Sequence, residues 1–254
     1  ETGDDIDNDD ILDEDEEFDE DEMDEQDELF SSFEDANVLL FFIGADAIKL
    51  AMNGDYNQQA KLDFMGTLYE SFLDRTGDAK TPIMIVISKS DLLSGSEKEN
   101  AKEFVFRTLQ SMFGAGTELT SAITMVTLGK NLSNYQGELE GELIIGPTQG
   151  NIHIPIVYSL FCVISNKIEE SIGKLTSAQN SYSSAQNDLA NEMKRSSFAR
   201  FFSSNETKIR NRITESNKAI GKEKDVLNKL TETLSKLKPL LLSGADVYIN
   251  GIKQ

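Results

Sequence analysis

The sequence predicts an α/β protein with a mostly parallel sheet in three layers, followed by a long antiparallel α-helical hairpin. Two observations carry this prediction. Apolar runs alternate with amphipathic stretches in residues 29–165, which is the order of a parallel sheet covered by helices on both faces. Residues 166–238 instead place apolar residues at helical spacing among Ser, Asn, Lys and Glu, a pattern typical of long helices.

Three apolar runs are expected to form the sheet. They are Asn37–Gly44, Ile83–Ile87 and Ser121–Leu128. Continuous apolar runs that end at turn residues indicate strands buried on both faces. Amphipathic helices are expected between these strands, at Asp55–Leu73 and at Ser94–Phe113.

The rest of the chain divides into a loop, the hairpin and a terminal segment. The Gly-rich stretch Lys130–Gly150 predicts an irregular functional loop or an insertion, with a short strand at Glu142–Ile145 as one interpretation, before a helix that begins near Ile156. The two long helices are expected to join at Ser196–Asn205, and Pro239 is expected to end the second one. Residues 239–254 are predicted to return to the α/β domain, with an Asn-Gly turn.

The formal net charge of -21 has its source in one segment. Residues 1–36 hold 21 Asp and Glu residues and no Lys or Arg, so 45 − 21 = 24 acids remain to balance the 24 bases of the rest. Like charges repel, and so polar a stretch buries too little apolar surface to offset its conformational entropy. We therefore predict that residues 1–28 are an acidic disordered segment.

The single cysteine, Cys162, lies in an apolar stretch, where a buried and unreactive thiol is expected. One cysteine cannot form a disulfide within the chain, which favours a reducing compartment. The longest apolar run, Ile152–Ile164, is too short to cross a bilayer. These features predict a cytoplasmic protein without a transmembrane segment.

A polar tetrad, Ser88-Lys89-Ser90-Asp91, follows the second apolar run. Ligands bind at the carboxyl ends of parallel strands, so the tetrad is expected where a ligand would be recognised. It resembles the [NT]KxD motif with which GTPases recognise guanine. The resemblance implies that Asp91 accepts two hydrogen bonds from the guanine edge, that the Lys89 stem covers the base, and that Ser88 replaces the usual Asn or Thr. The alternative is a strand end with a helix-capping turn.

The order of the strands is similar to that of the C-terminal part of a Ras-like (TRAFAC-type) P-loop GTPase domain. The three apolar runs would then match the fourth, fifth and sixth strands of that family. The resemblance implies that a backbone amide of Leu128 or Gly129, after the sixth strand, contacts the guanine carbonyl, and that the ligand is GTP or GDP. The long hairpin resembles, more narrowly, bacterial double-GTPase proteins of conflict systems.

The sequence departs from the family at the phosphate-binding motifs. It contains no GxxxxGK[ST], and no DxxG precedes the first apolar run. Nothing in the chain is therefore expected to hold the β-phosphate or a Mg²⁺ ion, which the resemblance implies only for a complete protein. We expect no GTP hydrolysis by this chain alone.

The run Asn37–Gly44 is apolar on both faces, yet the sequence offers no strand to pair with its outer edge. Native proteins avoid an open apolar edge because it promotes aggregation. We therefore expect this chain to be the C-terminal part of a longer protein, or to pair with another protein chain.

The hairpin bend is a second candidate site, formed by Arg195, Phe198, Arg200, Phe201 and Phe202. Basic residues beside aromatic ones can contact an acidic membrane surface or nucleic acid. The interpretation we favour is that the three Phe residues cap the hairpin core. The bend and the acidic segment carry an alternative hypothesis for the whole chain, a non-catalytic GTPase-like scaffold that binds partners.

Overall fold

The computed structural model describes residues 36–76, 81–110, 120–135, 138–143, 146, 149–194, 205–249 and 252–254. Within it, Asn37–Gln254 form one compact unit. The acidic segment predicted for residues 1–28 and the basic and aromatic residues of the hairpin bend lie outside the described residues.

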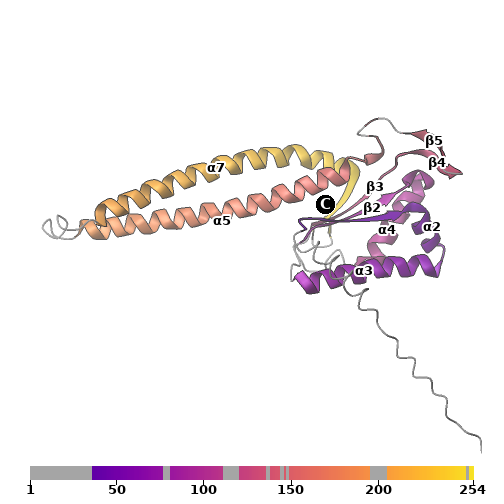
Figure 1. Cartoon of the computed structure of the whole chain (residues 1–254), viewed down its shortest axis with the longest axis horizontal. Coiled ribbons are helices and arrows are strands. Elements are labelled where there is room, and N and C mark those ends of the chain that lie inside the picture. The colour runs from indigo at the N-terminus through magenta and orange to yellow at the C-terminus, as the bar shows by residue number, and fades with distance from the viewer. Residues whose placement is uncertain are drawn as a thin grey trace, which may run out of the picture. The chain divides into compact units, whose positions relative to one another are not determined.

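A five-stranded sheet organises the described chain (Figure 1). Its strands are β1 (Leu39–Gly44), β2 (Ile83–Ser88), β3 (Thr120–Met125), β6 (Ala245–Ile249) and β7 (Ile252–Lys253), in the order β1-β2-β3-β6-β7. The first three strands pair in parallel, as predicted. The last two pair antiparallel, so the sheet is mixed and the prediction of a mostly parallel sheet is wrong. The reason is that the terminal residues enter the sheet from the end of the hairpin and add two strands.

Two helices, α2 (Ala45–Met52) and α3 (Tyr56–Thr76), connect β1 to β2. The second helix was predicted and begins after Asp55, whose Oδ1 accepts a hydrogen bond from the Gln58 amide at 3.1 Å, as an N-terminal cap does. The first helix was not predicted, because its eight residues follow the strand without a break. Gly54, at φ +90°, makes the turn between the two helices.

Helix α4 (Gly95–Thr108) connects β2 to β3 and begins with a capping interaction. The Ser94 amide donates to Glu97 Oε2 at 2.8 Å, which satisfies a backbone donor at the helix start. Lys49 of α2 pairs with the same carboxylate at 2.8 Å. The hydrogen bonds from Lys49 and from Ser94 lower the pKa of Glu97 to about 2, and the contact with Lys49 joins the last turn of α2 to the first turn of α4.

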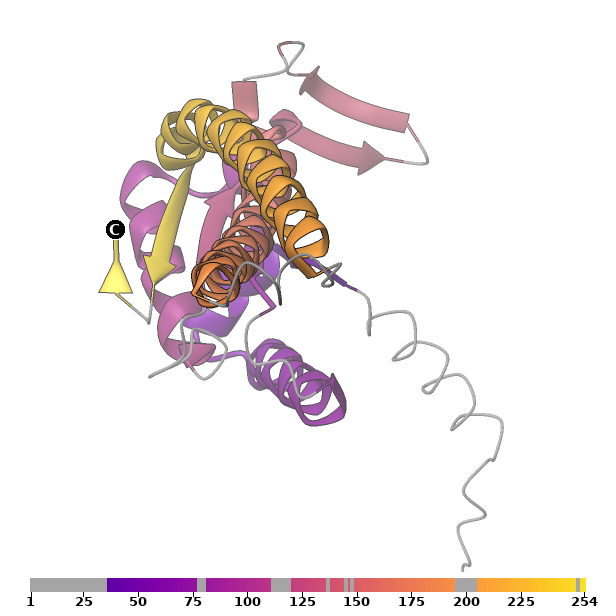
Figure 2. The ribbon, with the colours of Figure 1, turned by 90° about the vertical axis from the view of Figure 1, so that its left-hand side faces the viewer.

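The predicted hairpin is present as helices α5 (Ile154–Met193) and α7 (Asn205–Gly244), which lie side by side and run in opposite directions (Figures 1 and 2). Helix α7 continues past Pro239 for five residues, so the predicted end at this proline is wrong. Proline removes one hydrogen bond of the helix. Leu241, which is buried in the core beyond it, offsets that loss by packing.

The interface between the two long helices is narrow and partly polar. Ala185 is fully buried. The Ser171 hydroxyl donates to Glu223 Oε2 at 2.6 Å, and the hydroxyls of Ser181 and Ser216 are 3.2 Å apart. Small residues let the helix backbones approach closely, and a polar pair that must find its partner can fix the register of a helix pair.

The core joins the start of α5 and the end of α7 to one face of the sheet. Its buried members come from β2, β3, β6 and both helices: Met84, Val86, Ala122, Ile154, Val157, Tyr158, Cys162, Leu241 and Val247. The Tyr158 hydroxyl donates to the Ile83 carbonyl at 2.6 Å, so the polar end of this buried ring is satisfied. Burial raises the pKa of the Cys162 thiol to about 12, in keeping with the predicted unreactive thiol.

Helix α4 covers the opposite face of the sheet. Its Phe106 ring stacks on Tyr248 of β6 with ring centroids 4.6 Å apart. Val247, the preceding residue, belongs to the core on the α5 side, and successive residues of a strand face opposite sides of the sheet. Helices therefore lie on both faces.

The stretch predicted to be an irregular loop or insertion contains a separate two-stranded antiparallel sheet, so it is more regular than predicted. Its strands are β4 (Gly129–Tyr135) and β5 (Glu138–Leu143), with a register shift between Lys130 and Ser133. The short strand suggested at Glu142–Ile145 overlaps only the end of β5. The strands are mostly polar, so they lack the apolar runs by which buried strands are predicted.

The two edges of the five-stranded sheet differ in character. Strand β7 is two residues long, and its Lys253 pairs with Asp246 at 2.9 Å. Short, charged edges resist association with other strands. Strand β1 is six residues long and uncharged, and the described residues place no strand on its outer side. Its Leu40 and Phe42 are exposed, so the open apolar edge expected from the sequence is present in the described chain.

No helix within the described residues combines the length and the apolar character needed to cross a membrane.

Candidate functional site

The carboxyl ends of β1, β2 and β3 meet at one edge of the sheet, because the three strands are parallel. A cavity of about 930 Å³ lies there. Four of the five residues predicted to recognise guanine line it: Ser88, Lys89, Asp91 and Leu128. The fifth, Gly129, is buried beside them at the start of β4. The structure therefore brings together residues from two separate strand ends.

The loop after β2 is fixed by hydrogen bonds to both neighbouring strands. The Ser88 hydroxyl donates to the Ile43 carbonyl of β1 at 3.2 Å. The Ser90 amide donates to the Val126 carbonyl after β3 at 3.2 Å, and residues Ser90–Leu92 form a short 3-10 helix, η1. The side chain of Ser88 thus adds a hydrogen bond between the ends of β1 and β2.

Lys89 adopts a left-handed backbone conformation, with φ 55° and ψ 37°. This region costs a non-glycine residue free energy, and such residues concentrate at functional sites. The unusual conformation turns the chain sharply between β2 and η1. Its Nζ forms an ion pair with Asp46 Oδ2, at the start of α2, at 2.8 Å.

Asp91 is half-buried and held by the loop that follows β3. The Thr127 hydroxyl lies 2.8 Å from Asp91 Oδ1 and 2.6 Å from the Gly129 carbonyl oxygen, so these two acceptors share its single proton. Among the described residues no donor contacts the second oxygen, Oδ2. One side of the carboxylate is therefore anchored, and the other is available to a ligand.

The loop Thr127–Gly129 contains one backbone amide without a hydrogen-bond partner among the described residues. The Gly129 amide donates to the Thr127 hydroxyl at 3.2 Å, and the Thr127 amide donates to the Gly150 carbonyl at 3.0 Å. The Leu128 amide makes no hydrogen bond to another described residue. Of the two amides that the resemblance implies, Leu128 is the one free to donate to a ligand, while Gly129 shapes the loop.

The walls of the cavity are mostly apolar. They come from the outer face of β1, from the ends of β2 and β3 and from the segment that starts α5: Leu40, Phe42, Val86, Val126, Ile152, Pro155 and Ile156. Phe42 and Ile156 are each 64% exposed. An apolar cleft with a few convergent polar groups at one end is the usual form of a small-molecule site. Such a cleft suits a flat ring that has hydrogen-bond donors along one edge.

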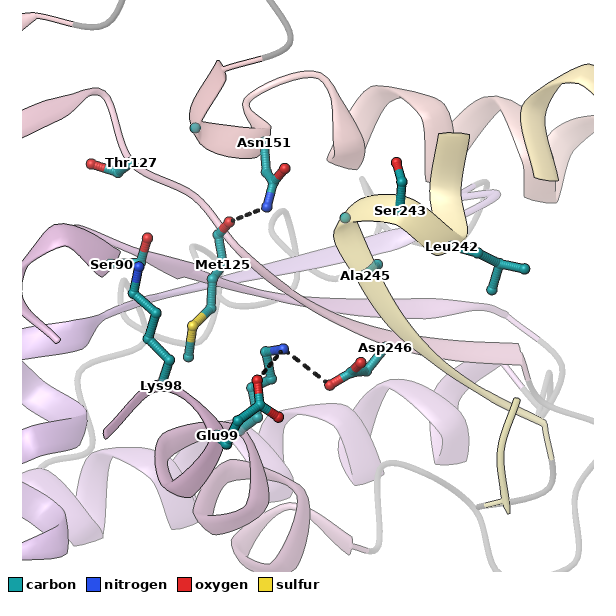
Figure 3. Close-up of a pocket in the computed structure, with 13 residues that line it drawn as sticks. Ser90, Lys98, Glu99, Met125, Thr127, Asn151, Leu242, Ser243, Ala245 and Asp246 are labelled. Atoms are coloured by element: carbon teal, nitrogen blue, oxygen red, sulfur yellow. Dashed lines mark hydrogen bonds and ion pairs between the residues drawn. The ribbon is translucent and has the colours of Figure 1, made fainter. Parts of the chain in front are cut away.

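A second, smaller cavity of about 310 Å³ lies beyond the same loops (Figure 3). Ser90 and Thr127 line it, whereas the next residues, Asp91 and Leu128, line the larger cavity, so the two loops separate the cavities. Three of its four charged side chains form ion pairs, because Lys102 Nζ lies 3.1 Å from Glu99 and 3.2 Å from Asp246, whereas Lys98 has no ion pair with a described residue. The dashed lines in Figure 3 end at Glu99 and Asp246. These contacts join α4 to β6.

No cluster of three or more His, Cys, Asp or Glu residues in the described part of the chain could hold a metal ion. His153, the single histidine, lies directly before α5, and its carbonyl accepts the Val157 amide at 3.0 Å.

The second predicted site cannot be placed. Its residues Arg195, Phe198, Arg200, Phe201 and Phe202 lie outside the described residues. The structure adds instead two site residues that the sequence did not identify, Asp46 and Thr127. Their polar partners are Lys89 and Asp91, which are 43 and 36 residues away in the sequence, and no local pattern signals such contacts.

No protein-family model matches this chain, and neither a curated protein nor a solved structure matches it.

Proposed function

We propose that this chain binds the base of a guanine nucleotide in the cavity at the carboxyl ends of β2 and β3. The observation that carries the proposal is that Asp91 and Leu128, whose amide makes no hydrogen bond to another described residue, both line one largely apolar cavity. Guanine presents two N–H donors beside a carbonyl acceptor along one edge. A carboxylate and a backbone N–H provide the complementary acceptor and donor.

The roles of the site residues follow from this pairing. Asp91 accepts from the ring N–H and the 2-amino group of guanine, with its carboxylate oriented by Thr127. The Leu128 amide donates to the guanine carbonyl. The Lys89 stem covers one face of the base, and Ser88 holds the loop to β1.

The parallel strands β1, β2 and β3 would then correspond to the fourth, fifth and sixth strands of a Ras-like GTPase domain. The proposal is limited to base recognition, because the phosphate-binding motifs of that family are absent from the sequence. GTP or GDP is the expected ligand. Binding of phosphate and Mg²⁺ would depend on residues outside this chain.

Comparison of nucleosides tests the proposal without reference to phosphate. Equilibrium dialysis of the full chain should give binding in the order guanosine, then inosine, then adenosine. Inosine lacks the 2-amino group and so loses one hydrogen bond to a charged acceptor, which should weaken binding by about tenfold or more. Adenosine presents an acceptor toward Asp91 and should not bind detectably. Equal affinity for the three nucleosides, or no binding of guanosine, would refute the proposal.

A further inference from the structure

We infer that Asp46 is a positioning residue for base recognition: it holds the Lys89 amine so that the stem of Lys89 lies along the cavity before a ligand binds. The inference rests on the proposed function and adds to it a residue that the GTPase-like motif does not contain. Asp46 belongs to the first turn of α2, after β1, whereas Lys89 follows β2. Both line the same cavity.

The contact between the two side chains is direct. Lys89 Nζ lies 2.8 Å from Asp46 Oδ2. The two side chains are 61% and 47% exposed, so the pair lies at the rim of the cavity rather than in the core. An exposed ion pair contributes little to folding stability. Its effect is therefore expected in the placement of the lysine and not in the stability of the domain.

Helix α2 fixes the carboxylate of Asp46. Oδ1 accepts a hydrogen bond from the Ala47 amide at 3.1 Å, while Oδ2 faces Lys89. The start of a helix also favours a negative charge. The hydrogen bond from Lys89, together with the backbone hydrogen bond from Ala47, lowers the pKa of Asp46 from its ordinary value despite partial burial. The carboxylate is therefore ionised at neutral pH and directed toward Lys89.

Gly44 leaves the space that this arrangement needs. A Cβ atom at this position would lie 2.2 Å from Asp46 Oδ1. The Gly44 backbone itself is extended, with φ -73° and ψ 136°, so any residue could adopt its conformation. The nearest atom is the end of a flexible side chain, so a methyl group at Gly44 would make the Asp46 carboxylate shift from its position beside Lys89.

The consequence for binding is a smaller entropic cost. A free lysine side chain samples many rotamers, and its ordering over a ligand weakens binding. Lys89 is held at both ends, by its left-handed backbone and by the ion pair at Nζ. Release of one end should weaken guanosine binding by roughly twofold to tenfold, the range set by immobilising one flexible side chain.

A double-mutant cycle on the full chain tests the inference. Guanosine affinity is measured by equilibrium dialysis for the wild-type chain, Asp46→Asn, Lys89→Met and the double variant. Methionine keeps an unbranched stem of similar length but cannot form the ion pair. Asp46→Asn should weaken binding when Lys89 is present and should have no further effect in the Lys89→Met chain. If Asp46 only supports the local structure, Asp46→Asn should weaken guanosine binding equally in the wild-type chain and in the Lys89→Met chain.

Two further variants complete the design. Gly44→Ala should reproduce the loss seen with Asp46→Asn, which keeps the test valid if one variant folds poorly. Asp63→Asn on α3 is the matched control, because it removes an exposed carboxylate away from the cavity. Thermal unfolding without ligand should be similar for all variants.

The outcomes separate the two claims. Wild-type affinity in Asp46→Asn, or an equal loss in both backgrounds, overturns the role of Asp46 and leaves base recognition by Asp91 intact. A wild-type chain that does not bind guanosine overturns the proposed function and this inference with it.

Discussion

The Asp91→Asn variant is expected to lose guanosine and to gain xanthosine. The amide that replaces the carboxylate would point an N–H group at the donor edge of guanine, so two charge-assisted hydrogen bonds are lost. Each such bond contributes about 1.5–3 kcal/mol, so the loss of two should lower guanosine affinity by about 100-fold or more. Xanthosine carries a carbonyl where guanosine has its 2-amino group and can accept from the new amide.

The measurement is equilibrium dialysis of both nucleosides against the wild-type chain and the variant. Asp225→Asn serves as the control, because it makes the same chemical change at an exposed position of α7 away from the cavity. It should leave both affinities unchanged. An Asp91→Asn chain that keeps wild-type selectivity for guanosine would show that this carboxylate does not contact the base.

The largest loss of stability is expected from Ile85→Ala. Ile85 is fully buried in β2, and it pairs with Phe41 of β1 and Ile123 of β3. Truncating a large aliphatic side chain in a core leaves a cavity and lowers the free energy of unfolding by about 2–5 kcal/mol. Urea denaturation followed by circular dichroism measures the change.

Ile252→Ala is the matched control for this variant. It makes the same substitution in a strand, but Ile252 is 68% exposed at the edge of the sheet. We expect a change within about 0.5 kcal/mol. Equal losses from Ile85→Ala and Ile252→Ala would contradict the central position of β2.

The elements that could be predicted from the sequence are those that a local pattern of neighbouring residues identifies, such as a continuous apolar run, a repeated apolar spacing or a capping residue. Ile83–Ile87 are all buried, and so continuous an apolar run has few alternatives to a central strand. The two long helices repeat one apolar spacing over many turns. The helix start at Ser94 carries its own local signal, the Glu three residues later.

The elements that were missed depend on contacts between distant residues. Strands β4 and β5 pair with one another, but their mostly polar sequences lack an apolar run and so indicated a loop. Pro239 indicated a helix end, but tertiary packing of the residues beyond it carries α7 further. Local propensity is a weak guide where packing provides the larger free energy.

The candidate site also has a part that the sequence predicts and a part that it does not. The tetrad after β2 was recognisable because its residues are adjacent in sequence and follow an obvious strand. The contacts of Thr127 with Asp91 and of Asp46 with Lys89 join segments that are distant in the sequence and that only the sheet brings together. The sequence could not distinguish the amides of Leu128 and Gly129, because only the structure shows that the Gly129 amide already donates a hydrogen bond to Thr127.

The most direct test of base recognition is an NMR titration of the isotopically labelled full chain with guanosine. If the base binds as proposed, the amide resonances of Ser88–Asp91 and Thr127–Gly129 should shift together, with the Leu128 amide shifting strongly. The resonances of α7 between Asn205 and Lys236 should not move. Saturable shifts confined to other regions, or no shifts at all at millimolar guanosine, would contradict the proposal that this cavity recognises guanine.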